Sequence, residues 1–156
     1  MQVSLTSFLL LALVALLLSA GVEDVRTREI ANWKNAAIAL LAPLWWVASG
    51  LTLWPGVAIQ IAVAMLVFGL FVLAFSMGQM GGGDVKMIGA LALWLPPSTL
   101  LWMLVLMSLL GGALTLLMLA EKALRRRKQL PEIPYGVAIA LAALVVIREP
   151  LLNQFR

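Results

Sequence analysis

Four stretches of this chain carry no charged residue, and they limit its fold more than any other feature. They cover residues 1–22, 35–83, 87–120 and 133–147, which is 22, 49, 34 and 15 residues. A helix needs about 20 apolar residues to cross about 30 Å of hydrocarbon. Because 63% of the residues are hydrophobic and only 12% are charged, an ordinary soluble domain is excluded. The sequence therefore predicts an all-α, polytopic membrane protein.

Turn signals divide the two longest of these stretches. Trp54-Pro55-Gly56 interrupts the second stretch, and Pro96-Pro97 interrupts the third. Proline lacks the N–H that a helix interior needs, and glycine tolerates turn geometry. Six transmembrane helices result, with a short fourth helix after a glycine loop, at residues 3–22, 35–53, 57–77, 85–95, 99–120 and 135–147. We expect them to form one membrane-embedded domain over residues 1–156.

The positions of the basic residues predict how the chain is oriented in the membrane. With six crossings, nine of the eleven Lys and Arg residues lie on one side, and only Arg148 and Arg156 lie on the other. Cytoplasmic loops hold such an excess, so both termini are expected outside a cell inner membrane. The cluster Arg125-Arg126-Arg127-Lys128 is expected to contact anionic lipid rather than nucleic acid. The first stretch is expected to remain as a span, since residues 1–18 lack the basic start of a cleaved signal peptide.

The residues available for chemistry are few. The chain has no Cys and no His, which excludes thiolate or imidazole metal sites and nucleophiles paired with histidine. Its two aspartates are Asp24 and Asp84, and the second follows three glycines directly before the short fourth segment. An ionisable group at membrane depth indicates a function, although an aspartate there can also be a helix N-cap. The glycines would let an extended peptide approach, or alternatively allow close helix packing.

The two aspartates together predict a catalytic pair. Asp24 lies in the first charged cluster after the first segment, where a topology anchor is the plainer interpretation. Two carboxylates about 5 Å apart repel by roughly 3 kcal/mol at an effective dielectric constant of about 20. One of them would then hold a proton while the other stays ionised, as an acid and base need for activating water. We therefore expect Asp24 and Asp84 to act without a covalent intermediate and without a metal.

Three separated segments resemble the motifs of the type IV prepilin peptidases, most of all the short members that serve tight-adherence (Flp) pili. They are Asp24-Val25-Arg26-Thr27-Arg28-Glu29-Ile30-Ala31-Asn32, Gly81-Gly82-Gly83-Asp84-Val85-Lys86 and Ile133-Pro134-Tyr135-Gly136-Val137-Ala138. The resemblance implies a six-span aspartic endopeptidase, with Asp24 and Asp84 catalytic, that removes a short basic prepilin leader on the cytoplasmic side. It implies a cut after a glycine, just before the prepilin's hydrophobic helix. It also implies nearby residues that support the loops or bind substrate: Asn32, Gly81, Gly82, Gly83, Lys86, Tyr135 and Gly136.

Departures from the family pattern bear on cofactors. Long relatives carry a cysteine-rich zinc element and methylate the new N-terminus with S-adenosylmethionine, but this chain has no Cys. We expect no cofactor for the peptidase, and S-adenosylmethionine only if the protein also methylates.

A second departure from the family pattern is Ala31, which stands where many relatives have proline. The absence of proline should loosen the loop after Asp24.

Other functions remain as alternatives. Lys86 and Tyr135 can be interfacial anchors instead of site residues. A metal-dependent phosphotransferase would need more converging acids than the two aspartates with Glu23 and Glu29. Presenilin-type peptidases share the glycine-aspartate element but place their other motifs differently. A small transporter or a pilus assembly subunit would explain the spans but not the pairing of the aspartates.

Overall fold

The computed structural model describes residues 4–124 and 133–153 as a bundle of six α-helices, with no strand among those residues. The all-α prediction is confirmed. The cluster at residues 125–128 lies outside the described residues, so its contact with anionic lipid stays a prediction. The helices are α1 Leu5–Thr27, α2 Asn32–Ala48, α3 Ala58–Ser76, α4 Gly82–Ala92, α5 Pro97–Leu124 and α6 Tyr135–Asn153.

Both predicted breaks between helices are confirmed. Before α3, the irregular turn Leu53–Val57 contains Trp54 in an extended conformation, with φ −132° and ψ 129°. After α4, the chain turns through residues 93–96, and Pro97 opens α5 at a position where a missing N–H breaks no helical bond. The first helix differs from its predicted bounds of 3–22, because it continues to Thr27. Asp24 therefore lies within the last turns of a helix rather than after it.

Three of the helical segments are long and apolar enough to cross a membrane: Leu5–Thr27, Leu53–Ser76 and Pro97–Leu124. The apolar part of α6, Tyr135–Arg148, is shorter. Large apolar side chains on the outer faces are exposed, such as Leu40 on α2 and Leu116 on α5. An apolar exterior of this kind is typical of a protein in contact with lipid. The chain is thus a membrane protein, while six crossings stay a prediction.

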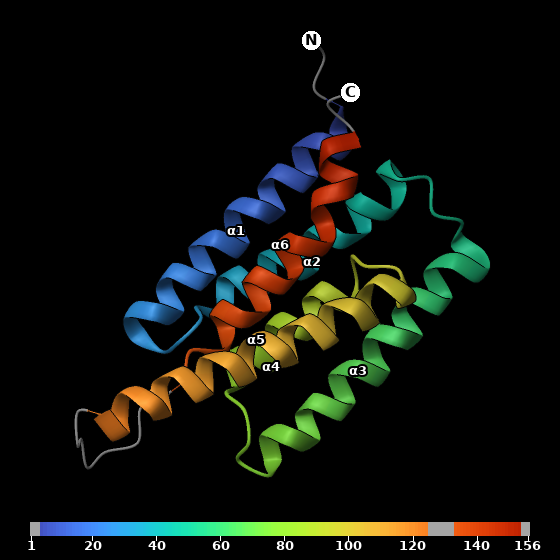
Figure 1. Cartoon of the computed structure of the whole chain (residues 1–156). Coiled ribbons are helices and arrows are strands. Elements are labelled where there is room, and N and C mark those ends of the chain that lie inside the picture. Colours follow the sequence, from blue (N-terminus) through green and yellow to red (C-terminus); the bar gives the residue numbers. More distant parts are fainter. Residues whose placement is uncertain (1–3, 125–132, 154–156) are drawn as a thin grey trace.

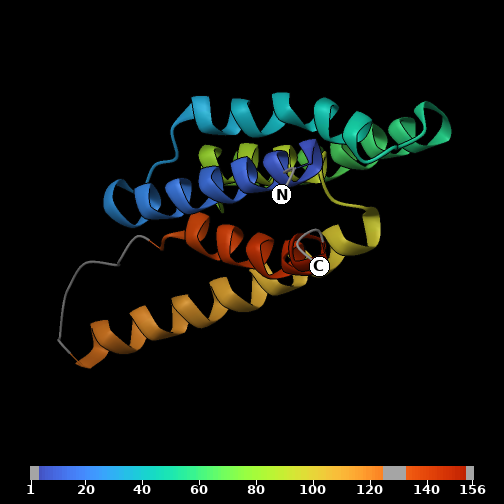
Figure 2. The same ribbon diagram turned by 90° about the horizontal axis from the view of Figure 1, so that it is seen from above.

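Successive helices run in opposite directions through the bundle (Figure 1). The end of α1, the start of α2 and the start of α6 therefore lie at one end, whereas the start of α1 and the end of α6 lie at the other. Figure 2 shows α6 between α1 and α5, and α6 packs against both. In the centre, α4 packs against α2, α3, α5 and α6, and its Met87, Ile88 and Leu91 side chains are fully buried.

The short α4 ends inside the bundle. Its 11 residues rise about 16 Å, roughly half of the hydrocarbon thickness. The carbonyl groups at a helix end lack helical partners, and in apolar surroundings each one needs a donor. The side-chain amide of Gln60 donates to the carbonyls of Ala92 and Leu95 at 2.7 and 2.6 Å. The indole N–H of Trp46 donates to the carbonyl of Leu93 at 2.7 Å.

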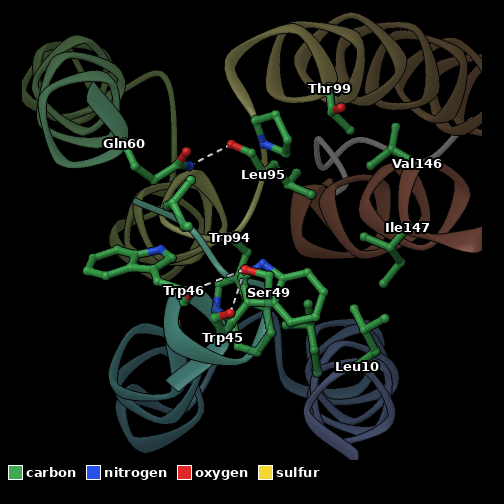
Figure 3. Close-up of a pocket in the computed structure, with 13 residues that line it drawn as sticks. Leu10, Trp45, Trp46, Ser49, Gln60, Trp94, Leu95, Thr99, Val146 and Ile147 are labelled. Carbon is green, nitrogen blue, oxygen red and sulfur yellow. Dashed lines mark hydrogen bonds between the residues drawn. The ribbon is translucent and has the colours of Figure 1, made fainter. Parts of the chain in front are cut away.

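A cavity of about 320 Å³ lies beside this buried end of α4 (Figure 3). We name it the tryptophan cavity, because Trp45, Trp46 and Trp94 all line it. The rings of Trp45 and Trp94 stack with centroids 5.7 Å apart. Leu10 and Ile147 close it from α1 and α6.

Candidate active site

A second cavity, of about 310 Å³, lies at the opposite end of α4, and both aspartates line it. We name it the aspartate cavity. Although Asp24 and Asp84 are 60 positions apart in the sequence, the fold brings them to one space. The end of α1, the loop after it, the first residue of α2 and the start of α4 supply the lining, which consists of Asp24, Arg28, Glu29, Ile30, Asn32, Gly81, Gly82, Gly83 and Asp84. Of the predicted glycine loop, only Gly81 precedes α4, because Gly82 and Gly83 are its first two residues.

The start of α6 packs against Asp24 and donates a hydrogen bond to its carboxyl group. Its side chain is only 4% exposed, and its Oδ2 accepts a hydrogen bond from the Val137 N–H at 3.0 Å. The same N–H also donates to the Pro134 carbonyl at 3.2 Å, and the helix dipole places positive charge at this end of α6. A Cβ added to Gly136 would lie 2.9 Å from Cγ of Asp24 and 2.7 Å from Cδ1 of Ile30. Only glycine at position 136 therefore lets α6 approach Asp24 this closely.

Asp84 is the third residue of α4, directly before the predicted fourth segment at 85–95. Gly81, not Asp84, occupies the N-cap, so the alternative of Asp84 as N-cap is wrong. Burial, and next the negative charge of Asp24, raise the pKa of Asp84 to about 7, against a hydrogen bond from the Gly81 backbone. Asp84 is therefore protonated in mildly acidic solution, while an ordinary aspartate is ionised.

The acidic neighbour of Asp24 has a different role. The Glu23 carboxylate pairs with the Lys34 ammonium at 2.9 Å and accepts the Ala31 N–H at 3.1 Å. Lys34 is itself buried and also donates to the carbonyl of Ser19 at 3.0 Å. These bonds tie the loop after α1 to both helices that it joins. Glu23 is thus a fixed anchor of the loop and does not line the aspartate cavity.

The predicted supporting residues divide into two groups. Asn32 and all three glycines line the cavity with the aspartates, and Gly136 lies behind Asp24. Lys86 and Tyr135 do not line it. Lys86 donates to Oδ1 of Asn32 at 2.7 Å and so joins α4 to α2. The ring of Tyr135 lies over Gly111 of α5, where an added Cβ would be 2.8 Å from Cε1.

Five contributors to the site were missed from the sequence, and two of them, Arg28 and Glu29, line the cavity. The Val137 backbone N–H has no sequence signature, because every residue except proline carries that group. Ile30 closes the loop side of the cavity, and a Cβ on Gly83 would lie 3.3 Å from its Cβ. Asn35 donates from Nδ2 to the Gly83 carbonyl at 3.0 Å and so connects α2 to the glycine segment. The signal available in the sequence was a second polar amide, Asn35, three residues after Asn32 at the start of an apolar stretch.

A model of the type IV leader peptidase family matches residues 11–116, which is about two thirds of the chain. No curated protein and no solved structure matches the chain. The matched region contains both aspartates and the three glycines, and it ends before Tyr135, Gly136 and Val137.

Proposed function

The chain belongs to the type IV leader peptidase family, and we propose that it is an aspartic endopeptidase with Asp24 and Asp84 as its catalytic pair. The observation that carries the proposal is the shared cavity, which holds both carboxyl groups at one end of the bundle. The raised pKa of Asp84 supports it, because a neighbouring carboxylate is one of its causes. Two interacting carboxyl groups with different protonation are what water activation requires.

The proposed reaction uses water held between the two side chains. We assign the base to Asp24, since the Val137 N–H already orients one of its oxygens, and the acid to Asp84. Water attacks the scissile carbonyl carbon and gives its proton to Asp24. As the carbon–nitrogen bond breaks, the proton of Asp84 passes to the leaving nitrogen. A proton moving from Asp24 to Asp84 restores the starting state, with no covalent intermediate.

The proposed substrate is a prepilin with a short basic leader, of the tight-adherence (Flp) kind. Asp24 and Glu29 line the cavity, and their carboxylates attract the Lys and Arg side chains of such a leader. Arg26, Arg28 and Lys34 lie at this same end of the bundle, which supports a cytoplasmic orientation by the positive-inside rule. We propose an inner-membrane protein with the aspartate cavity facing the cytoplasm and both termini outside.

No cofactor enters this reaction, because water and two carboxyl groups supply every bond and proton. S-adenosylmethionine would be needed only for a second activity, methylation of the new N-terminus. That activity is a separate proposal, tested by incubating cleaved product with labelled S-adenosylmethionine.

Coexpression of the full chain with a candidate prepilin tests the catalytic pair. Asp24→Asn and Asp84→Asn should each slow leader removal by about 10³-fold or more, and the double variant should lose little beyond that. Glu23→Gln is the matched control, because Glu23 is adjacent but anchors the loop outside the cavity, and it should keep most activity. Substantial cleavage by either asparagine variant at normal membrane levels would refute the pair.

A further inference from the structure

A groove of about 390 Å³ begins beside the aspartate cavity and is lined by α2, α4 and Phe68 of α3. We name it the α2–α4 groove. Asn32 lines both the groove and the aspartate cavity, so the two spaces adjoin at this residue. A chain segment that runs from the aspartates into the groove would pass Asn32 and its hydrogen bond with Lys86.

Each of the two helices presents one face to the groove. On α2 the lining residues are Asn32, Asn35, Ala36 and Ala39. Their spacing of three, one and three residues places them on a single helical face. The groove is polar where it meets the aspartate cavity and is lined by small side chains further along α2.

On the α4 side the lining has the same spacing, with Lys86, Gly89, Ala90 and, directly after the helix, Leu93. It too begins with a polar residue, and the small residues Gly89 and Ala90 follow, with the Phe68 ring against Gly89. Small residues at helix surfaces let another helix approach closely within a membrane. The shape alone does not identify what binds there.

The side chain of Asn35 indicates what kind of group binds in the α2–α4 groove. It is 4% exposed and lines the groove, and its Nδ2 is used by the Gly83 carbonyl. Its Oδ1 is a buried acceptor that receives no hydrogen bond from any residue the structure describes. A buried polar atom without a partner is unfavourable, so a ligand that donates a hydrogen bond to this atom would be favoured.

The start of an α-helix has hydrogen-bond donors that lack acceptors. Its first four N–H groups have no helical acceptor, and in apolar surroundings each one needs an acceptor from elsewhere. A substrate cut just before an apolar helix brings such N–H groups past the aspartates. An acyl chain carries no donor, so it would leave Oδ1 of Asn35 unpaired.

We propose that the α2–α4 groove binds the first turns of the substrate's apolar helix, with Oδ1 of Asn35 accepting one of its free N–H groups. This inference rests on the proposed function, because it places the segment that follows the cleaved bond. A rival groove of about 200 Å³ lies between α1 and α6, lined by residues such as Leu18 and Leu141. That lining is aliphatic throughout and has no polar side chain.

Disulfide trapping can distinguish the two grooves, because the chain has no cysteine of its own. In an Asp84→Asn background, single cysteines are introduced by Ala36→Cys in the α2–α4 groove, Leu141→Cys in the α1–α6 groove, and Ala62→Cys on the exposed face of α3. The probe is a synthetic peptide with a short lysine-rich leader, a glycine and a 20-residue apolar helix, with one cysteine in its first turn. In phosphatidylcholine vesicles, trapping by Ala36→Cys should be at least tenfold faster than by either other variant.

Each result decides the proposal. Equal trapping at positions 36 and 62 would indicate random contact in the bilayer, and faster trapping at position 141 would favour the rival groove; either overturns the inference. A disulfide between two copies of Ala36→Cys that forms faster than the peptide adduct would show a second chain as the occupant, and also overturns it. An excess of cysteine-free probe should block trapping at position 36, while the leader alone should not.

A cleavage assay separates this inference from the catalytic proposal. With Asp84 intact, Ala36→Leu should raise KM for the full probe at least tenfold with little change in kcat, and the control Ala62→Leu should change neither. If the intact protein fails to cut the probe while trapping at position 36 persists, the proposed function fails and the groove remains a binding site. If cutting is normal and Ala36→Leu has no effect on KM, the groove inference fails alone.

Discussion

The two cavities at opposite ends of α4 have almost the same volume, about 310 and 320 Å³, yet their polar groups are used differently. In the tryptophan cavity, Gln60 donates to the carbonyl of Leu95 (Figure 3) and to that of Ala92, and Trp46 donates to the carbonyl of Leu93. In the aspartate cavity, two carboxyl groups face a space bordered by glycines. Volume is therefore no guide to chemistry here. The aspartate cavity has available carboxyl groups and is suited to a reaction. The tryptophan cavity, where the donors are already bonded to backbone carbonyl groups, is suited to stabilising the fold.

Among the changes that test this difference between the two cavities, Gly136→Ala should have the largest effect, a loss of leader cleavage. The new methyl group would lie 2.9 Å from Cγ of Asp24, which requires the carboxyl group or the start of α6 to move. Displacement of a catalytic group by about 1 Å can cost 10²-fold, so we expect leader cleavage to fall by about that factor. Gly21→Ala is the matched control, because its methyl group would meet Ala140 at an ordinary 3.5 Å. Equal activity of the two variants would show that Asp24 tolerates the crowding.

At the other end of α4, Gln60→Leu should change stability rather than rate. It keeps the side-chain size but leaves the carbonyls of Ala92 and Leu95 without their donor. Each unsatisfied group costs about 1–3 kcal/mol, so we expect a clearly lower melting temperature in detergent. Cleavage by the folded fraction should stay within about twofold of the original protein. A lower kcat at an unchanged melting temperature would assign the tryptophan cavity a part in the reaction.

The pH dependence of cleavage should report the state of Asp84. Its pKa of about 7 means that the proton needed by the leaving group is present below that pH and is lost above it. We expect kcat/KM to fall by about tenfold for each pH unit above 7, as for a single required acid. Activity should return when a sample held at pH 9 is brought back to pH 6, which separates titration from unfolding. A flat profile between pH 6 and pH 9 would contradict the assignment of the acid.

The smallest effect is expected from Ala31→Pro in the loop between α1 and α2. Ala31 has φ −57°, which suits proline, and a compatible proline stabilises by about 0.4–1 kcal/mol. However, the Ala31 N–H donates to the Glu23 carboxylate, and proline has no N–H to make this hydrogen bond. We therefore expect the lost bond to outweigh the gain from proline, seen as a slightly lower melting temperature. A rise in melting temperature would show that Glu23 finds another donor.

The sequence predicted the general plan of the bundle because that plan follows from where the charges are absent. The stretches without charge hold most of the residues of the six helices, and Pro55-Gly56 and Pro96-Pro97 mark two of the turns. Their ends were less predictable. The first helix extends through Glu23 and Asp24 because Arg28 closes it with φ 60°, a conformation that usually indicates glycine.

The meeting of Asp24 and Asp84 in one cavity was predicted from their charge and from the family resemblance, and their catalytic role stays a prediction. The surroundings of the pair could not be predicted. Gly136 matters through a distance of 2.9 Å, and Val137 through its backbone, and neither property is encoded in a residue type. The bond between Glu23 and Lys34 depends on how the loop folds back, which the run of mixed charges left open.

The hydrogen bond between Val137 and Asp24 joins residues 113 positions apart, and this has a consequence for biosynthesis. A ribosome makes Asp24 early, but the N–H that orients it exists only after the start of α6 has been made and inserted. The chain should therefore remain inert until its last helix joins the bundle. Such an order would prevent a partly synthesised peptidase from cutting other proteins that are entering the same membrane.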